Sequence, residues 1–211
     1  MTREDWLKER QQGLGASDAA AILGLSNWKS SDALWETKTG QAQPDDISDN
    51  PFVQYGIAAE PLLRELFKLD YANVYTVDYE EYKIVKNAEY PFIFATLDGE
   101  LAEIATGRKG VLEIKTAEIM NAGQWMQWKD RIPDSYYVQL CHALLATGFD
   151  FAVLKAQIKY HKDGVLNIAT RHYHIERNEV EDDIELLKKE CIKFWQSVES
   201  NERPPLKLPP I

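Results

Sequence analysis

The stretch FIFATLDG (Phe92–Gly99), followed by VLEIKT (Val111–Thr116), decides how this chain is expected to fold. Both are short runs rich in β-branched and aromatic residues and lie among Gly, Pro and Asn, a pattern that predicts β-strands. Side chains alternate between the two faces of a strand. Leu112 and Ile114 are therefore expected to point into an apolar core, which leaves the charged residues of this strand on the opposite face.

That opposite face brings charged residues together. Glu113 and Lys115 share it, and Asp98 is expected to end the preceding strand, with Gly99 letting the chain turn away. If the two strands pair, Asp98 and Glu113 converge beside Lys115. Neighbouring carboxylates repel, and a divalent cation relieves the repulsion while gaining oxygen ligands. Such an ion can activate a water and stabilise a scissile phosphate, while the lysine orients the water or neutralises the phosphate.

The same pattern has a plainer interpretation. An acidic residue followed by E-x-K on a strand occurs by chance in many proteins, where it forms a solvated ion pair of little energetic value. The motif alone therefore does not decide between a catalytic site and an ordinary strand surface.

The flanking segments predict helices around a small mixed sheet. Further strands are predicted over Tyr82–Val85, Phe151–Tyr160 and Leu166–Ile175, the last two forming a hairpin through Lys162–Gly164. Helices are predicted over Asp18–Leu23 with Ser17 as N-cap, from Ser30 or Ser31 to Gly40, over Pro51–Leu69, from Pro133 through Ala146 to Gly148, and over Glu179–Ser200. We expect an α/β (α+β) fold, with residues 1–203 forming one domain and residues 204–211 a proline-rich tail.

Composition places the chain among ordinary globular proteins. Of its 211 residues, 45% are hydrophobic and 27% charged, and the formal net charge is −10. The N-terminus lacks a signal-peptide pattern and no long apolar run is present, so we expect no membrane span and a cytoplasmic location. The negative charge argues mildly against a protein that coats nucleic acid, but it is compatible with a local basic groove and with a cation site.

Cysteine and histidine give no sign of a zinc site. Cys141 and Cys191 lie among apolar residues of predicted helices and are expected to be buried thiols. His172 and His174 would share a strand face, but no third ligand accompanies them.

Several motifs together resemble a known family. TLDG…VLEIK resembles the D…ExK core of the PD-(D/E)xK nucleases, and the surrounding chain is similar to their YqaJ-like viral recombinase branch, which includes phage lambda exonuclease. Three other stretches resemble motifs of that branch in the same order: WLKERQQGLGASDAAAILG (Trp6–Gly24), YGIAAEPLLRELF (Tyr55–Phe67) and YYVQLCHALLATG (Tyr136–Gly148). The one departure is Leu97, which stands where a proline usually precedes the first acid.

The resemblance implies a restriction-endonuclease-like core and a role for each matching residue. Asp98, Glu113, the Ile114 carbonyl and Glu60 would bind the metal, Mg²⁺ or in its place Mn²⁺, with two ions in the site. Lys115 would position the attacking water, and Gln139 would hold that lysine, the water or the DNA strand. Arg10 and Ser17 would hold a terminal 5′-phosphate, because a helix N-terminus and a guanidinium both suit an anion.

The function that the resemblance implies is a Mg²⁺-dependent 5′→3′ exonuclease of bacterial hosts, phage or prophage encoded. It would act on double-stranded DNA ends as a ring-shaped homotrimer, together with a single-strand annealing protein, and leave 3′ single-stranded tails for recombination. Two alternatives stay open: an endonuclease or nickase with the same core, and a catalytically silent DNA-binding or assembly module. Trp125 and Trp128 are expected to serve in the core or a subunit contact more readily than as a base-stacking platform.

Overall fold

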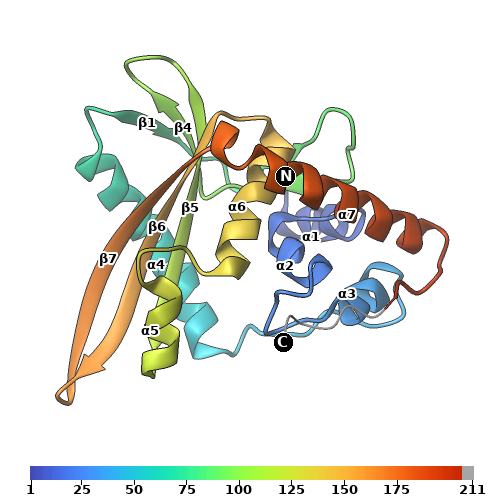
Figure 1. Cartoon of the computed structure of the whole chain (residues 1–211), viewed down its shortest axis with the longest axis horizontal. Helices are drawn as coiled ribbons and strands as arrows, with labels where there is room; N and C mark the ends of the chain where they lie inside the picture. Colours follow the sequence, from blue (N-terminus) through green and yellow to red (C-terminus); the bar gives the residue numbers. More distant parts are fainter. Residues whose placement is uncertain (206–211) are drawn as a thin grey trace.

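The computed structural model of the chain describes residues 1–205. Most of the predicted proline-rich tail, residues 206–211, lies outside these described residues. The helices are α1 (Arg3–Gln11), α2 (Ala19–Ile22), α3 (Ser31–Lys38), α4 (Pro51–Asp70), α5 (Ala122–Trp128), α6 (Asp134–Thr147) and α7 (Glu181–Glu199), with 3-10 turns η1 (Ala16–Asp18) and η2 (Arg177–Glu179). The strands are β1 (Tyr75–Asp78), β2 (Val85–Lys86), β3 (Phe94–Ala95), β4 (Gly99–Glu103), β5 (Lys109–Ile119), β6 (Phe151–Lys162) and β7 (Val165–Glu176) (Figure 1).

Five of the strands form one mixed sheet. Their order is β1-β4-β5-β6-β7, while β2 and β3 form a separate two-stranded ribbon. β5 and β6 run parallel, and the other neighbours are antiparallel. Parallel neighbours need a long crossover connection, which α5 and α6 supply here. The predicted fold class, a small mixed sheet flanked by helices, is confirmed.

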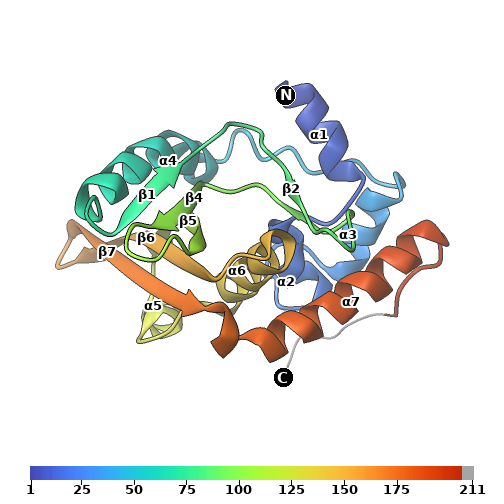
Figure 2. The same ribbon diagram turned by 90° about the horizontal axis from the view of Figure 1, so that it is seen from above.

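Helices cover both faces of this sheet. α6 packs on one face, with α2 and α7 behind it, and buries Val111 and Leu154. α4 packs on the other face, where Phe67 meets Leu112 and Ile114. Figure 2 shows α4 and α6 on opposite sides of the strands. Because both faces are covered, residues 110–114 of β5 are all buried.

The predictions for the strands are only partly correct. The hairpin is confirmed, since β6 and β7 pair over their whole length around a turn at Asp163 and Gly164, both with positive φ. The predicted strands at 82–85 and 92–97 shrink to the two-residue β2 and β3. β1 and β4 escape prediction because YTVD and GELAE are short and contain acidic residues, which strands disfavour.

The backbone around Asp98 differs from the prediction. Asp98 does not end a strand; it stands immediately before β4, and Gly99 is the first residue of β4 rather than a turn. Gly99 pairs with Leu112, and a Cβ there would approach a side-chain carbon of Val77 to 3.0 Å and of Leu112 to 3.3 Å. The absence of a side chain at Gly99 of β4 therefore leaves room for the side chains of Val77 in β1 and Leu112 in β5. The expected pairing of residues 92–97 with β5 is wrong, because β3 pairs with β2 and the residues after Asp98, in β4, pair with β5. Asp98 still lies next to β5, since it directly precedes β4.

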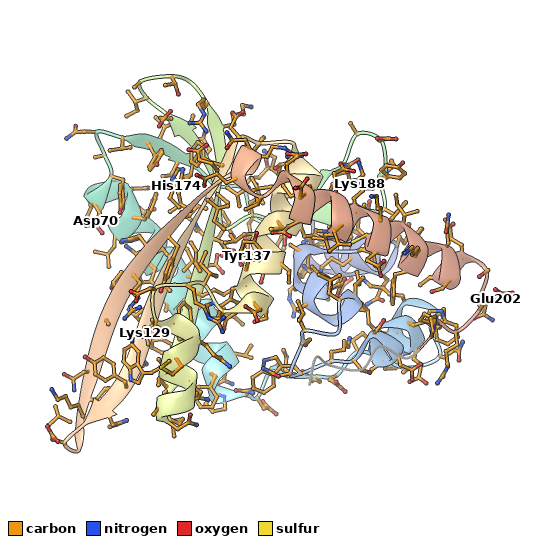
Figure 3. The ribbon with its side chains drawn as sticks, in the orientation of Figure 1. Asp70, Lys129, Tyr137, His174, Lys188 and Glu202 are labelled. Atoms are coloured by element: carbon orange, nitrogen blue, oxygen red, sulfur yellow. The ribbon has the colours of Figure 1, made fainter. Side chains whose placement is uncertain are left out.

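The longer helices agree with the prediction at their ends. α6 ends at Gly148 in the left-handed conformation, with φ 70°. α7 lies within the predicted range, and Ser30 caps α3 by accepting the Ala33 N–H at 3.1 Å. Tyr137 of α6, labelled in Figure 3, donates its hydroxyl hydrogen to Asp183 of α7 and joins the two helices.

The N-terminal helix start differs from the prediction. Ser17 does not cap α2; it lies inside η1, and the side chain of Asp18 accepts the N–H of Gly15 at 3.0 Å. The Asp at the end of the 3-10 turn thus closes this turn and takes the position assigned to the serine.

Aromatic and sulfur side chains mostly serve the core, as expected. Trp128 is 4% exposed, and Trp125 is half-buried edge-on to Tyr160 at 4.9 Å between ring centroids. Cys141 and Cys191 are both buried thiols. In the part of the chain that the structure describes, no helix has the length and apolar character needed to cross a membrane.

Gly110 tests the packing of β5 against β6. In Gly110→Ala the new methyl would lie 2.2 Å from the ring of Phe151, which is fully buried. Overpacking of this kind costs about 1–3 kcal/mol, so we expect the free energy of unfolding in urea to fall by that amount. The control is Gly56→Ala in α4, whose new methyl would meet only Thr116 Oγ1 of β5, at 3.3 Å. Unchanged unfolding of Gly110→Ala would contradict this packing.

Candidate active site

β5 carries a carboxylate and an ammonium on one face. Glu113 and Lys115 point toward α6, while Leu112 and Ile114 pack toward α4, so the predicted alternation is confirmed. Lys115 Nζ lies 2.6 Å from Glu113 Oε1. No pattern in the sequence indicates that this face is also covered. Glu113 is only 3% exposed, and the pair is therefore no solvated surface ion pair.

α6 covers this pair with two side chains. Gln139 Nε2 donates to Glu113 Oε1 at 2.7 Å, so the glutamine holds the carboxylate rather than the lysine. The ring of Tyr136 lies with its centroid 5.7 Å from Lys115 Nζ. A buried carboxylate is stable only when its charge and lone pairs are satisfied, and Lys115 and Gln139 meet that need.

Asp98 closes the open edge of β5. β4 pairs with β5 only as far as Gly99 and Leu112, so beyond Leu112 this edge has no neighbouring strand. The side chain of Asp98 takes the vacant place and accepts the Ile114 N–H at 2.7 Å. The N–H and C=O of one strand residue point to the same side, so the Ile114 carbonyl also faces the Asp98 edge.

α4 contributes the third carboxylate and an arginine that the sequence analysis missed. Arg64 is buried, and its guanidinium donates to the Glu60 carboxylate and to the backbone carbonyl of Asp98. The signal for this residue was its spacing, since Arg64 follows Glu60 by one helical turn. Arg64 thus fixes Glu60 next to the Asp98 segment.

The electrostatics of the site show that these groups are close together. Burial raises the pKa of Asp98 well above its usual value, and the negative charges of Glu113 and Glu60 raise it further. Burial and the Glu113 charge also raise the pKa of Glu60, although Arg64 opposes them. Burial lowers the pKa of Lys115, but the Glu113 and Asp98 carboxylates outweigh it, and the net pKa is raised. The structure therefore brings together Glu60, Asp98, Glu113, Lys115 and Gln139.

The predicted metal ligands fit a hard divalent cation. The carboxylates of Glu60, Asp98 and Glu113 and the carbonyl of Ile114 offer oxygen atoms, the ligands that Mg²⁺ and Mn²⁺ prefer. Within residues 1–205 no three His, Cys, Asp or Glu side chains already surround a common point. The carboxylates are instead turned toward the Arg64 guanidinium, the Ile114 N–H, Lys115 and Gln139. Burial and the negative charges of Glu113 and Glu60 raise the pKa of Asp98, and a cation would relieve the repulsion among these carboxylates.

Arg10 and Ser17, the predicted ligands of a 5′-phosphate, lie together and form a second polar grouping. Arg10 donates to Ser17 Oγ at 3.1 Å and reaches Thr96 Oγ1 at 3.5 Å, while its guanidinium lies 4.6 Å from the Trp6 ring centroid. Ser17 is exposed, so this grouping is open to solvent. Thr96 stands two residues before Asp98, and it connects the grouping to the segment that carries the first acid.

A buried histidine joins the two groupings through α6. His142 Nε2 lies 3.1 Å from the Leu14 carbonyl and 3.2 Å from the Phe94 carbonyl. Both partners are acceptors, so Nε2 carries the ring hydrogen and donates it. The sequence alone suggested histidines only as possible zinc ligands, and this role of His142 was not predicted. α6 therefore holds the Arg10 segment, the Asp98 segment and, through Gln139, the carboxylate of β5.

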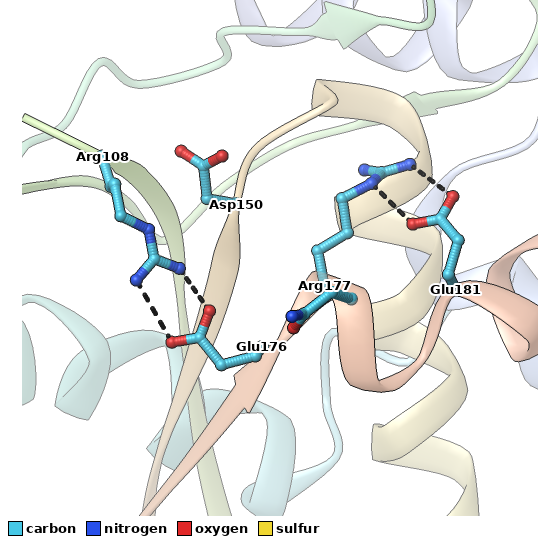
Figure 4. A pocket seen from close by; sticks show the side chains of 6 residues that line it. Arg108, Asp150, Glu176, Arg177 and Glu181 are labelled. Atoms are coloured by element: carbon cyan, nitrogen blue, oxygen red, sulfur yellow. Dashed lines mark hydrogen bonds and ion pairs between the residues drawn. The ribbon is translucent and has the colours of Figure 1, made fainter.

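A cavity of about 420 Å³ lies elsewhere, at the beginning of β5 and β6 (Figure 4). Its two arginines are already bound, Arg108 by Glu176 and Arg177 by Glu181. The cavity contains none of the predicted site residues, and its paired charges leave no cation free for an anionic ligand.

Comparison with known proteins identifies the family. The family model of the YqaJ-like viral recombinase domain matches residues 5–150. This chain belongs to the YqaJ-like viral recombinase family. The matched residues include all of the candidate site, from Arg10 to Gln139, and end immediately before β6, so that β6, β7 and α7 lie outside the match.

Individual relatives agree with this assignment. This chain is 34% identical over 151 residues to an uncharacterized protein YqaJ of Bacillus subtilis (strain 168). The aligned residues cover 72% of this chain and 44% of the relative. The chain thus spans less than half of that relative's length.

Solved structures share the fold. An alkaline exonuclease from Laribacter hongkongensis superposes with a TM-score of 0.66 at 15% identity, covering 94% of both chains. A phage related exonuclease from Haemophilus somnus 129PT gives 0.55 at 16% identity, covering 90% of this chain and 96% of that one.

The raised pKa of Asp98 predicts a stabilising substitution in the metal-free protein. A carboxyl whose pKa is higher when folded binds more protons in the folded state, so stability falls as pH rises from the unfolded toward the folded pKa. We expect Asp98→Asn, which stays neutral and can still accept the Ile114 N–H, to melt higher than wild type in EDTA at neutral pH. A gain of about 1 kcal/mol corresponds to roughly 2–4 °C for a chain of this size.

The control for this measurement is Asp163→Asn, in the exposed hairpin turn, for which no such gain is expected. Equal melting temperatures of Asp98→Asn and wild type from pH 6 to 8 would contradict the proposed charge surplus.

Proposed function

We propose that this chain is a divalent-metal-dependent exonuclease that resects double-stranded DNA in the 5′→3′ direction. The product would be a 3′ single-stranded tail for phage-type recombination by strand annealing. The observation that carries the proposal is the grouping of Asp98, Glu113 and Lys115, with Arg10 and Ser17 on the adjoining segment. Membership in a viral recombinase family and the names of the solved neighbours, both exonucleases, support it.

The metal in this proposal is Mg²⁺, with Mn²⁺ able to replace it and room for two ions. Asp98, Glu113, Glu60 and the carbonyl of Ile114 would hold it. When bound, such an ion supplies a more acidic water and stabilises negative charge on a scissile phosphate. Arg64 and Gln139 keep Glu60 and Glu113 in place, so two of the ligands are held by neighbours before the ion binds.

Lys115 would donate hydrogen bonds and supply positive charge during the reaction. Its pKa is raised, so the ammonium stays charged at neutral pH. A charged lysine beside the scissile phosphate donates hydrogen bonds to a phosphate oxygen or to the attacking water, and it stabilises the negative charge that develops. The ring of Tyr136 and the carboxylate of Glu113 limit the positions that this ammonium can take.

Arg10 and Ser17 would recognise the end of the substrate. A guanidinium and a hydroxyl that already contact each other can together hold the oxygens of a terminal 5′-phosphate. Recognition of this group makes the enzyme act from 5′ ends and distinguishes an exonuclease from an endonuclease or nickase, which needs no end.

The proposed assembly is a ring-shaped homotrimer that works with a single-strand annealing protein. A ring reconciles the net charge of −10 with DNA binding, because only its channel has to be basic. The resemblance described above supports this assembly and this partner.

Loss of the lysine is expected to abolish most of the activity. With a linear, 5′-phosphorylated duplex and Mg²⁺, Lys115→Ala should degrade DNA about 100- to 1,000-fold more slowly than wild type, because the developing charge loses its partner. Lys193→Ala on the exposed surface of α7 is the control and should match wild type. The proposal fails if wild type is inactive with both Mg²⁺ and Mn²⁺, or if Lys115→Ala retains full rate.

Loss of the arginine is expected to remove the preference for phosphorylated ends. Hydrogen bonds to a charged group contribute about 1.5–3 kcal/mol, so Arg10→Ala should lower the rate ratio of 5′-phosphate over 5′-hydroxyl ends roughly 10- to 100-fold. Arg131→Ala, an exposed arginine after α5, is the control. A wild-type chain that cuts closed circular DNA as fast as linear DNA would rule out the exonuclease.

A further inference from the structure

Trp28 is the most exposed tryptophan that the structure describes. It stands in the loop between α2 and α3 with 93% of its surface in solvent, whereas Trp35 and Trp128 are 3% and 4% exposed. Trp6, Trp125 and Trp195 are each half-buried. An indole in water adds nothing to the core, and packing within one copy of the chain therefore does not account for Trp28.

The loop holds Trp28 in a defined place. Ser26 Oγ accepts the backbone N–H of Trp28 at 3.2 Å and that of Lys29 at 3.1 Å. At the base of the loop, the Leu25 N–H bonds the Ala20 carbonyl of α2 at 2.8 Å. The indole is thus presented from an ordered turn, and little conformational freedom would be lost when a ligand covers it.

This loop lies beside the proposed end-binding residues. Asp18 and the four residues of α2 separate Ser17 from the start of the loop, and those four helical residues rise about 6 Å. In Figure 1 the loop lies below α2, and the N-terminal end of α6 is the lower end of that helix in the same view.

The loop itself, residues 23–30, contains one cation, Lys29, and no carboxylate, although the whole chain is acidic. Burial lowers the pKa of Lys38, and the neighbouring Arg10 and Lys29 cations lower it further despite the Asp18 carboxylate. Lys38 Nζ lies 3.1 Å from the Asp18 carboxylate and donates to the backbone carbonyl of Arg10 at 2.8 Å, so Lys38 connects α3 to the Arg10 segment. Lys29 forms no ion pair with any of residues 1–205, and its ammonium remains available for a phosphate.

We propose that Trp28 stacks on a nucleobase next to the DNA end whose phosphate binds at Arg10 and Ser17, with Lys29 on the adjacent backbone. This inference rests on the proposed function. An exposed indole beside an unpaired lysine is a combination that binds unstacked bases, and because every base has a π-face it suits an enzyme that must accept any sequence. Trp28 would hold the end of the strand while the carboxylates act on its phosphate.

The test is DNA binding by variants in an inactive background. Asp98→Asn protein, with Mg²⁺, is titrated against a 5′-phosphorylated duplex that carries a fluorophore far from that end, and anisotropy is recorded. Loss of one base stack should weaken binding by Trp28→Ala roughly 5- to 100-fold, whereas Trp28→Phe, which keeps an aromatic face, should retain most of the affinity. Leu186→Ala, which removes an exposed apolar side chain from α7, should bind like the parent.

A second readout separates stacking from other roles. DNA should quench the fluorescence of the parent more than that of Trp28→Phe, because only the parent has an indole at the contact. Equal affinities of Trp28→Ala and the parent would overturn the inference, and so would a lower oligomeric state of Trp28→Ala in light scattering, which would assign Trp28 to a contact between copies. If wild type degrades phosphorylated ends while either result holds, the proposed function stands and only the role of Trp28 falls.

Discussion

The burial of Glu113 against Lys115 beneath α6 is the interaction on which the rest of the site depends. A carboxylate with 3% exposure persists only because Lys115 and Gln139 satisfy it. Asp98 and Glu60 add two more acidic groups, while Arg64 adds one cation. Three carboxylates then face two cations, and burial together with the charges of Glu113 and Glu60 raises the pKa of Asp98. A site that is stable in this form and still carries surplus negative charge is prepared for a divalent cation.

The fold produces this arrangement because β4 begins only at Gly99. Gly99 pairs with Leu112, so the edge of β5 is open beyond Leu112, and the side chain of Asp98 lies there. α4 reaches the opening from one face of the sheet and α6 from the other. α6 has a second task, since His142 binds the Leu14 and Phe94 carbonyls and thereby ties the Arg10 segment to the acidic residues. One helix thus sets the position of the proposed end-binding residues relative to the proposed metal ligands.

Local patterns were enough to predict the parts that depend on local geometry. Alternation along β5 separated Glu113 and Lys115 from Leu112 and Ile114, and the caps at Ser30 and Gly148 followed from single residues. The long-range features could not be predicted in this way. A residue without a side chain fits at Gly99 because a Cβ there would crowd Val77, a contact between distant segments, and the acidic GELAE strand gives no local signal. The burial of Glu113 depends on where α6 lies, and Arg64 acquires its role only when α4 meets the Asp98 backbone.

The most direct measurement of the central claim is a titration of the protein with Mn²⁺, in which electron paramagnetic resonance counts the free ion. Wild type should bind Mn²⁺ saturably near neutral pH, and Mg²⁺ should displace it. Glu113→Gln, which keeps the size of the side chain and removes its charge, should lose this binding while its circular dichroism spectrum stays that of the wild type. Wild-type protein that binds no Mn²⁺, or Glu113→Gln protein that binds it equally well, would contradict the assignment of this buried acidic grouping as the metal site.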